Sequence, residues 1–287
     1  MTTHITEADI AAARARVPLA FRAPLPVRLR RIALYTGLIA IYAYCLWAFD
    51  FSPMRIWNGL TKLGQIAGFM FPPHIWETWY EWSEILKGLG ETLSMSFLGT
   101  ILGAILALPL SLLGAKNIMP WPWVRYPARR FYDLIRAFET LILALIFIRA
   151  FGLGPLAGIL AITVSEIGTF SKLFSEALEN TSEKPVEGVK ASGGTRLEQI
   201  RYAISPQVNP VILSILLYNF ESNVRSGTIL GIVGAGGIGF LLSDRIAAYK
   251  WDEAWSIIFL IIAMVYVIDW LSAMVRRKII GEWSGAK

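Results

Sequence analysis

Long apolar runs, separated by short polar segments, follow one another along almost the whole chain. The first extends from residue 32 to about residue 51, and further runs lie near 92–113, 132–151, 156–178, 208–230 and 254–275. A helix needs about 20 consecutive apolar residues to cross a bilayer, and several of these runs approach that length. The pattern therefore predicts an all-α membrane protein with about six transmembrane helices.

The composition supports the same class. Hydrophobic residues make up 55% of the 287 residues and charged residues only 17%, whereas a soluble domain usually carries about 25% charged residues. The first apolar run is too long for a signal-peptide core and lacks a small-residue cleavage site, so we expect it to be retained as a span. With Cys45, His4 and His74 as the only cysteine and histidines, the usual zinc ligand sets cannot be assembled, and we expect no metal site.

The basic residues predict which loops face the cytoplasm. The net charge is +6, but the lysines and arginines lie between the apolar runs, which favours membrane topology over nucleic-acid binding. Six spans place both termini on one side, and that side holds eighteen basic residues against six on the other. Because cytoplasmic loops carry such an excess, we predict that the N-terminus, the 180–206 loop and the C-terminus are cytoplasmic.

The same pattern divides the chain into four expected parts. Residues 1–31 form a basic cytoplasmic segment, and 32–87 hold the first transmembrane helix and an outer segment rich in tryptophan and tyrosine. Such rings accumulate at the membrane interface, so we expect the outer segment to lie there, with a ligand-stacking platform as the alternative. Residues 88–279 form a core of five helices, and 280–287 form a cytoplasmic tail. Within this core, Gly99, Gly103 and Ala107 predict close helix packing.

The most specific local pattern lies in the loop 181–210. Gly193 and Gly194 can end a first short helix, because glycine readily adopts a positive φ. Thr195, followed three residues later by Glu198, is a capping box that predicts a second helix. From the residues alone, this segment is either a docking surface for a partner or a solvated connector.

This loop resembles the conserved cytoplasmic loop of ABC importer permeases. Glu187 takes the place of that loop's glutamate, Gly193 its glycine and Pro206 its proline, and the spacing of nineteen residues from glutamate to proline is kept. Gly188 and Val189 replace the family's two alanines. The resemblance implies a type I ABC importer permease architecture, with the loop as the coupling helix that docks on a partner ATPase. The residues it implies for ATPase coupling are Glu187, Gly188, Lys190, Ala191, Gly193, Gly194, Arg196 and Pro206. We expect Pro206 to end the second helix just before the fifth span.

A second stretch, which begins at Asn219, resembles the end of phosphonate importer permeases in its segment ESNVRS and in the glycines that follow. Ionisable groups at membrane depth normally face a bundle interior or a wet cavity. Glu221 and Arg225, four residues apart, can pair on one helix face. The candidates for a translocation path are Asn219, Glu221, Ser222, Asn223, Arg225, Ser226, Glu139 and Glu166.

Gly234, Gly236 and Gly239 spell the dinucleotide-binding pattern GxGxxG. That pattern requires a βαβ unit, and here another apolar run follows instead. We therefore expect these glycines to permit close packing and an unwound or re-entrant backbone that lines a cavity.

The resemblance implies the membrane subunit of an ATP-driven importer in a bacterial inner membrane. The implied cargo is a phosphonate, with phosphite or another small oxyanion as the alternative. No GxxxxGK[ST] phosphate loop occurs, so we expect no ATPase activity and no cofactor in this chain, with ATP and Mg²⁺ on the partner ATPase. The implied partners are a second copy of the chain (or a second type of permease), two ATPase subunits and a periplasmic or lipid-anchored binding protein.

Two functions of other classes fit less well. A channel would explain polar residues in the membrane but not the loop that resembles a coupling helix. An intramembrane enzyme would need a Ser–His or metal constellation, and neither His4 nor His74 lies in an apolar run.

Overall fold

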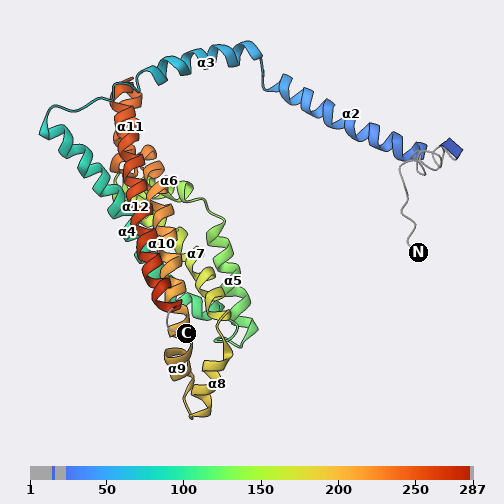
Figure 1. Cartoon of the computed structure of the whole chain (residues 1–287), viewed down its shortest axis with the longest axis vertical. Coiled ribbons are helices and arrows are strands. Elements are labelled where there is room, and N and C mark those ends of the chain that lie inside the picture. The colour runs from blue at the N-terminus through green and yellow to red at the C-terminus, as the bar shows by residue number, and fades with distance from the viewer. Residues whose placement is uncertain (1–14, 17–23, 285–287) are drawn as a thin grey trace. The chain divides into compact units, whose positions relative to one another are not determined.

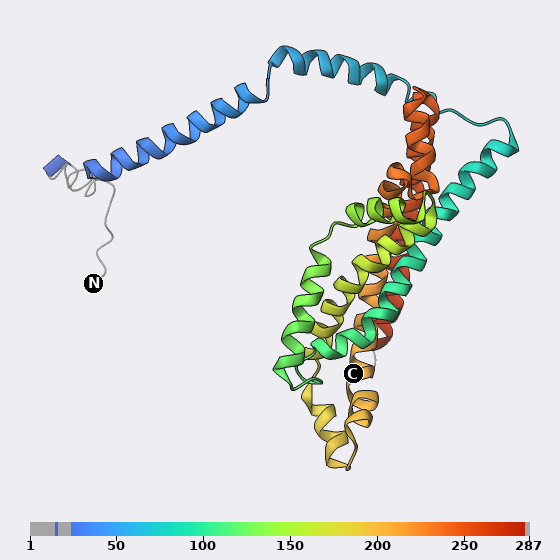
Figure 2. The same ribbon diagram turned by 180° about the vertical axis from the view of Figure 1, so that it is seen from behind.

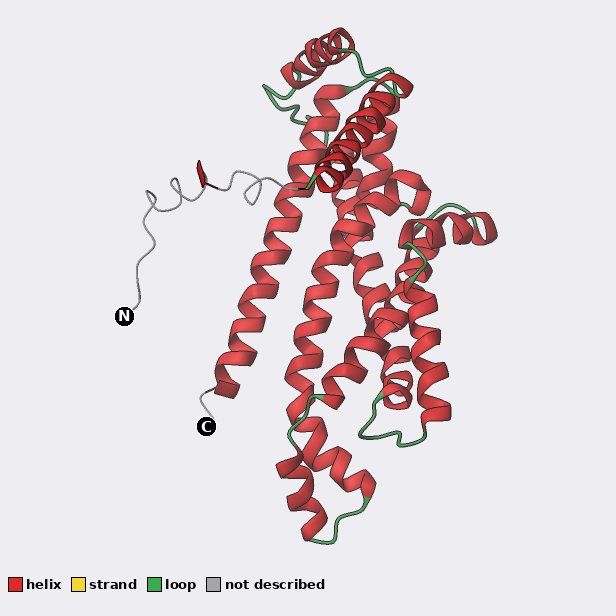
Figure 3. Cartoon of the chain, turned by 90° about the vertical axis from the view of Figure 1, so that its right-hand side faces the viewer, coloured by secondary structure: helices red, strands yellow, loops and turns green. Residues whose placement is uncertain are grey.

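The computed structural model describes residues 15–16 and 24–284, with only the backbone of 279–284. Every regular element in this part of the chain is helical (Figure 3). Most of the expected segment 1–31, and residues 285–287 of the expected tail, lie outside the described residues. The chain separates into two units, Met1–Ala67 and Gly68–Lys287.

The first unit contains α2 (Leu25–Ala48) and nearly all of α3 (Pro53–Gly68). α2 is long and apolar enough to cross a membrane. It begins inside the expected segment 1–31, because Pro24 and Pro26 lie where proline is tolerated at a helix start.

The long helices of the second unit form a bundle (Figures 1 and 2). They are α4 (Trp79–Gly114), α7 (Pro155–Glu179), α10 (Ser205–Leu230) and α12 (Trp251–Ser284). Each lies in a segment long and apolar enough to span a membrane, and together with α2 they give five candidate spans in the described chain.

α4 is the centre of this bundle and packs most closely against α7. Ile85, Met95 and Ala104 of α4, and Ala115 directly after its end, belong in that order to four clusters of buried side chains that follow the helix from end to end. A Cβ atom at Gly103 would lie 2.6 Å from the Cβ of Glu166 on α7. The prediction of close packing at the small residues of α4 is therefore confirmed.

The apolar run 132–151 does not form one continuous span, and this prediction was wrong. α5 (Pro122–Arg136) ends inside the run, and α6 (Thr140–Phe151) begins after a break. The amphipathic helix α5 takes the first five residues of the run, which include Asp133 and Arg136, and Glu139 has an extended backbone directly before α6. The 12 residues of α6 extend over only about 18 Å. The described residues therefore contain five long candidate spans and one shorter apolar helix.

The helix that precedes the fifth span does not end at Pro206, which is a second correction. α8 (Glu183–Ala191) and α9 (Arg196–Gln199) are followed by a π-helical turn, η1 (Ile200–Ile204), that continues directly into α10. The N–H of Ser205 donates to the carbonyl of Ile200, five residues back. Pro206 lies at the start of α10, where its missing N–H is tolerated at the end of the wider π turn. The loop thus continues into the span without a break in the helix.

The glycine run after α10 interrupts the helix, as the sequence predicts. A second π-helical turn, η2 (Gly231–Ala235), is followed by α11 (Gly237–Ala247). Gly234 and Gly236 have φ values of +110° and +81°, a region in which glycine alone is unstrained. A Cβ at Gly231 would lie 2.6 Å from the carbonyl oxygen of Gly236, so the chain also folds tightly on itself here.

One tryptophan of the expected interfacial segment lies in the core instead. Trp76 is buried together with Ile85, Ile238 and Ile257, and its ring makes an edge contact with Trp82 at a centroid distance of 5.2 Å. The sequence could not separate this ring from its exposed neighbours Trp79 and Tyr80, because all of them lie in one aromatic-rich segment.

Candidate coupling hairpin and membrane polar cluster

The helices α8 and α9 project from one end of the bundle (Figure 1), and we call residues 183–199 the α8–α9 hairpin. Its base is apolar: Val186 of α8, and Ile200 of η1 directly after the hairpin, pack against a cluster that includes Leu178 of α7 and Val208 of α10. Both ends of the hairpin are therefore anchored to long helices, α7 on one side and α10 on the other.

The turn between α8 and α9 depends on Gly193 and Gly194. Gly193 has a φ of +84°, and its N–H donates to the carbonyl of Lys190 at 3.0 Å. Gly194 donates to the carbonyl of Val189, also at 3.0 Å, and a Cβ at Gly194 would lie 2.6 Å from the Cγ1 of Val189. The positive φ predicted for Gly193 is confirmed.

The predicted capping box begins α9. The backbone N–H of Thr195 donates to the Glu198 carboxylate at 2.6 Å, and the N–H of Glu198 donates back to the Thr195 hydroxyl at 3.4 Å. The Thr195 hydroxyl also donates to this carboxylate, at 2.7 Å. The bonds that the carboxylate accepts from the Thr195 backbone and hydroxyl hold the pKa of Glu198 below its usual value, because they favour the charged form.

Most residues that the sequence assigns to ATPase coupling are exposed on the hairpin. Glu187, Lys190 and Arg196 line a cavity of about 410 Å³ between α8, η1 and the end of α7. The exposed members of the predicted set are Glu187, Gly188, Lys190, Ala191, Gly193, Arg196 and Pro206, whereas Gly194 is partly buried. Charges of both signs at the rim of a groove suit a polar docking contact.

Three polar side chains meet inside the bundle, and we call them the membrane polar cluster. Asn223 of α10 donates through Nδ2 to Glu166 of α7 at 2.7 Å and to the hydroxyl of Thr100 of α4 at 3.0 Å. All three side chains are buried. The second carboxylate oxygen of Glu166 is also buried and has no hydrogen-bond partner among the described residues. Since buried polar groups strongly favour partners, this cluster ties three spans into one arrangement.

A different side of α10 carries an ion-pair network with α12. Arg225 lies 3.5 Å from Glu221 and 3.4 Å from Asp269, and Arg276 lies 3.3 Å from the second oxygen of Glu221. The Glu221–Arg225 pair predicted from the spacing is confirmed.

The structure thus divides the translocation candidates among four places. Asn223 and Glu166 lie inside the bundle, and Glu221 and Arg225 face α12. Asn219, Ser222 and Ser226 are partly buried on α10, whereas Glu139 is exposed at the start of α6.

Three residues that complete these clusters, Thr100, Asp269 and Arg276, are absent from the sequence-based set. Asp269 carries a usable signal, because it is an acidic residue within the apolar run 254–275. Thr100 carries none, since a threonine in a span can bond to its own helix, and Thr100 also donates to the carbonyl of Ser96.

Comparisons with known proteins agree with this arrangement. The model of the family described as "Binding-protein-dependent transport system inner membrane component" matches residues 99–281. The phosphite transport system permease protein PtxC of Stutzerimonas stutzeri is 32% identical over 252 residues, which cover 87% of this chain and 89% of PtxC. A protein of Escherichia coli strain K12, described as the cryptic phosphonate transport system permease protein PhnE2, is 45% identical over 121 residues, or 42% of this chain and 99% of that protein.

A solved structure matches the fold as well. A chain of the MetNI methionine ABC transporter in an inward-facing conformation superposes with a TM-score of 0.62 at 20% identity. The match covers 70% of this chain and 99% of the MetNI chain. At this level of identity the likeness supports the fold.

Proposed function

Because the chain belongs to the family of binding-protein-dependent transport system inner membrane components, we propose that it passes a phosphonate across the bacterial inner membrane. It is a permease subunit of an ABC importer, built from membrane-spanning helices. Among its relatives, PhnE2 is described as a phosphonate permease and PtxC as a phosphite permease. Phosphite, or another small oxyanion, is therefore the second candidate cargo.

The observation that carries the proposed mechanism is the α8–α9 hairpin at the end of the bundle. It presents Glu187, Lys190 and Arg196 around a groove, and it is continuous with α10. In our proposal this hairpin docks on a partner ATPase in the cytoplasm, with Gly188, Ala191, Gly193, Gly194 and Pro206 shaping the contact. ATP binding to the ATPase subunits then switches the translocation path through the membrane from inward-facing to outward-facing. This switch is driven by the different affinities of the two states for the nucleotide.

The proposed assembly contains two copies of this chain, two ATPase subunits that bind ATP and Mg²⁺, and a periplasmic or lipid-anchored binding protein. Each copy of the chain has one α8–α9 hairpin, so two copies offer one docking site to each of the two ATPase subunits. The excess of basic residues on one side supports a cytoplasmic position for both termini and for the hairpin.

The proposed translocation path follows the exposed and polar side of α10. Arg225 is exposed there in the single chain and offers a guanidinium, which matches a phosphonate group in charge and geometry. Asn219, Ser222 and Ser226 lie on the same helix, while Glu166 and Asn223 hold α10 to α7.

Reconstitution with the partner subunits tests the function. We expect a phosphonate-loaded binding protein to stimulate ATP hydrolysis when this chain is placed in lipid with its ATPase subunits. The measurement is phosphate release with and without loaded binding protein, with unloaded protein as the control. If only a phosphite-loaded binding protein stimulated hydrolysis, phosphite would replace phosphonate as the cargo and the proposed mechanism would stand. If the chain associated with no ATPase subunit, the proposed coupling would be contradicted.

Arg225 pairs with Glu221 and Asp269, so its replacement alone would disturb these ion pairs as well as any contact with the cargo. We expect the double variant Arg225→Ala, Asp269→Asn to assemble normally, because it removes both members of one pair, and to lose most uptake. Its matched control is Asp269→Asn alone, which keeps the guanidinium. The measurement is uptake of radiolabelled phosphonate in proteoliposomes. Normal uptake by the double variant would reduce Arg225 to a structural role.

A further inference from the structure

α5 is an amphipathic helix that begins at the same end of the bundle as the α8–α9 hairpin. The segment that leads into α5 is tied to the end of α7, since Asn117 donates through Nδ2 to the carbonyl of Leu178 at 2.6 Å. The hairpin follows α7 directly. The charged face of α5 therefore lies at the level that the topology assigns to the cytoplasmic membrane surface.

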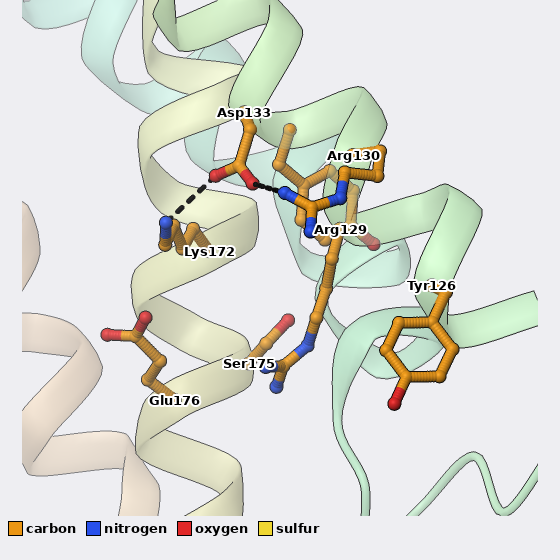
Figure 4. Close-up of a pocket in the computed structure, with 8 residues that line it drawn as sticks. Tyr126, Arg129, Arg130, Asp133, Lys172, Ser175 and Glu176 are labelled. Atoms are coloured by element: carbon orange, nitrogen blue, oxygen red, sulfur yellow. Dashed lines mark hydrogen bonds and ion pairs between the residues drawn. The ribbon is translucent and has the colours of Figure 1, made fainter. Parts of the chain in front are cut away.

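A cavity of about 220 Å³ lies between α5 and α7 (Figure 4). Three cations line it, namely Arg129 and Arg130 of α5 and Lys172 of α7, together with the ring of Tyr126. The acidic residues at this cavity are Asp133 and Glu176.

Of these three cations, Arg130 is held by the longest ion pair. Asp133 lies 2.8 Å from Lys172 but 3.5 Å from Arg130. Arg129 is engaged by Glu179 at 2.7 Å and by the carbonyl of Gly114. The side chain of Arg130 is 82% exposed, so its guanidinium can turn to an external anion at little cost.

An apolar cavity of about 540 Å³ adjoins the first one. Pro122, Trp123 and Pro127 line it, and it shares Tyr126 and Arg130 with the charged cavity. Trp123 is 89% exposed, which is costly in water but favourable for an amphipathic ring at the headgroup level. A ligand that fills both cavities must carry an anionic group next to a hydrocarbon chain.

We propose that these two adjoining cavities bind an anionic glycerophospholipid of the cytoplasmic leaflet. The lipid phosphate lies against Arg130, and an acyl chain lies along Trp123 and Pro127. Charge complementarity favours this occupant, because α5 carries Arg125, Arg129, Arg130 and Arg136 against the single acidic residue Asp133. Basic pockets at the cytoplasmic side of membrane helices bind such headgroups. The lipid would brace α5 against α7 at the base of the hairpin.

Lipid binding by the full chain in detergent tests this site. Native mass spectrometry should show retained phosphatidylglycerol and much weaker retention of phosphatidylcholine. Arg130→Ala should weaken phosphatidylglycerol binding about fivefold, since one basic residue near an anionic surface contributes about 1 kcal/mol. Trp123→Ala should weaken the binding of both lipids, and Arg130→Lys should largely keep the preference.

The matched control is Arg277→Ala, which removes another exposed basic residue of the second unit away from both cavities. It should bind phosphatidylglycerol like the original chain. Equal retention of the two lipids, or unchanged binding by Arg130→Ala, would overturn the proposal. Complete competition by inorganic phosphate, with no effect of Trp123→Ala, would also overturn it, because the site would then bind a free anion.

Discussion

Gly103→Val is expected to destabilise the helix bundle. A Cβ at Gly103 would lie 2.6 Å from the Cβ of Glu166 and 3.2 Å from the carbonyl oxygen of Thr163. These atoms are the backbone and the first carbon of the facing helix, so α4 and α7 would have to move apart. Such overpacking costs about 1–3 kcal/mol. The separation would also strain the 2.7 Å hydrogen bond between Glu166 and Asn223.

The measurement is the midpoint of thermal unfolding of the detergent-purified chain, followed by size-exclusion chromatography. Gly90→Val is the matched control on the same helix, because a Cβ at Gly90 meets no atom within 4 Å. Valine and glycine differ little in helix propensity, so the control should unfold near the original temperature. If both variants unfolded alike, close packing at Gly103 would not be the cause.

Local signals in the sequence predict the hairpin well. The positive φ of Gly193 and the capping box of Thr195 and Glu198 depend on residues within a few positions of one another. The same holds for the Glu221–Arg225 pair, which is set by one helical turn. The sequence therefore predicts these features without any knowledge of the tertiary structure.

The errors arise where tertiary contacts or neighbouring helices decide the outcome. The run 132–151 looks continuous in hydropathy, yet its start belongs to α5, where Asp133 pairs with Lys172 of α7. Proline at 206 looks like a helix end, but the π turn η1 admits it. Glu221 and Arg225 also pair with Arg276 and Asp269 of α12, and these pairs depend on the packing of α10 against α12. Asp269 can be recognised in the sequence as an acidic residue in a span, but its partner cannot.

Gly193→Val is expected to uncouple ATP hydrolysis from transport while the bundle still folds. The φ of +84° at Gly193 is strained for a β-branched residue, at a cost of about 1–2 kcal/mol. The turn would relax toward a negative φ and re-aim α9 relative to α8. A change of that size alters an equilibrium by roughly 5–30-fold. We expect the uptake of cargo per ATP hydrolysed to fall by roughly 5–30-fold, with uptake and hydrolysis both measured in proteoliposomes that contain the partner subunits.

Gly193→Asn separates backbone conformation from added bulk. No atom lies within 4 Å of a Cβ at this position, so either side chain fits in the isolated chain. Asparagine adopts a positive φ far more readily than valine, and the Asn variant should therefore keep most of the coupling. If Asn and Val reduced coupling equally, the effect would come from a blocked docking surface. If neither did, the turn geometry would have no part in transmitting force from the ATPase to α7 and α10.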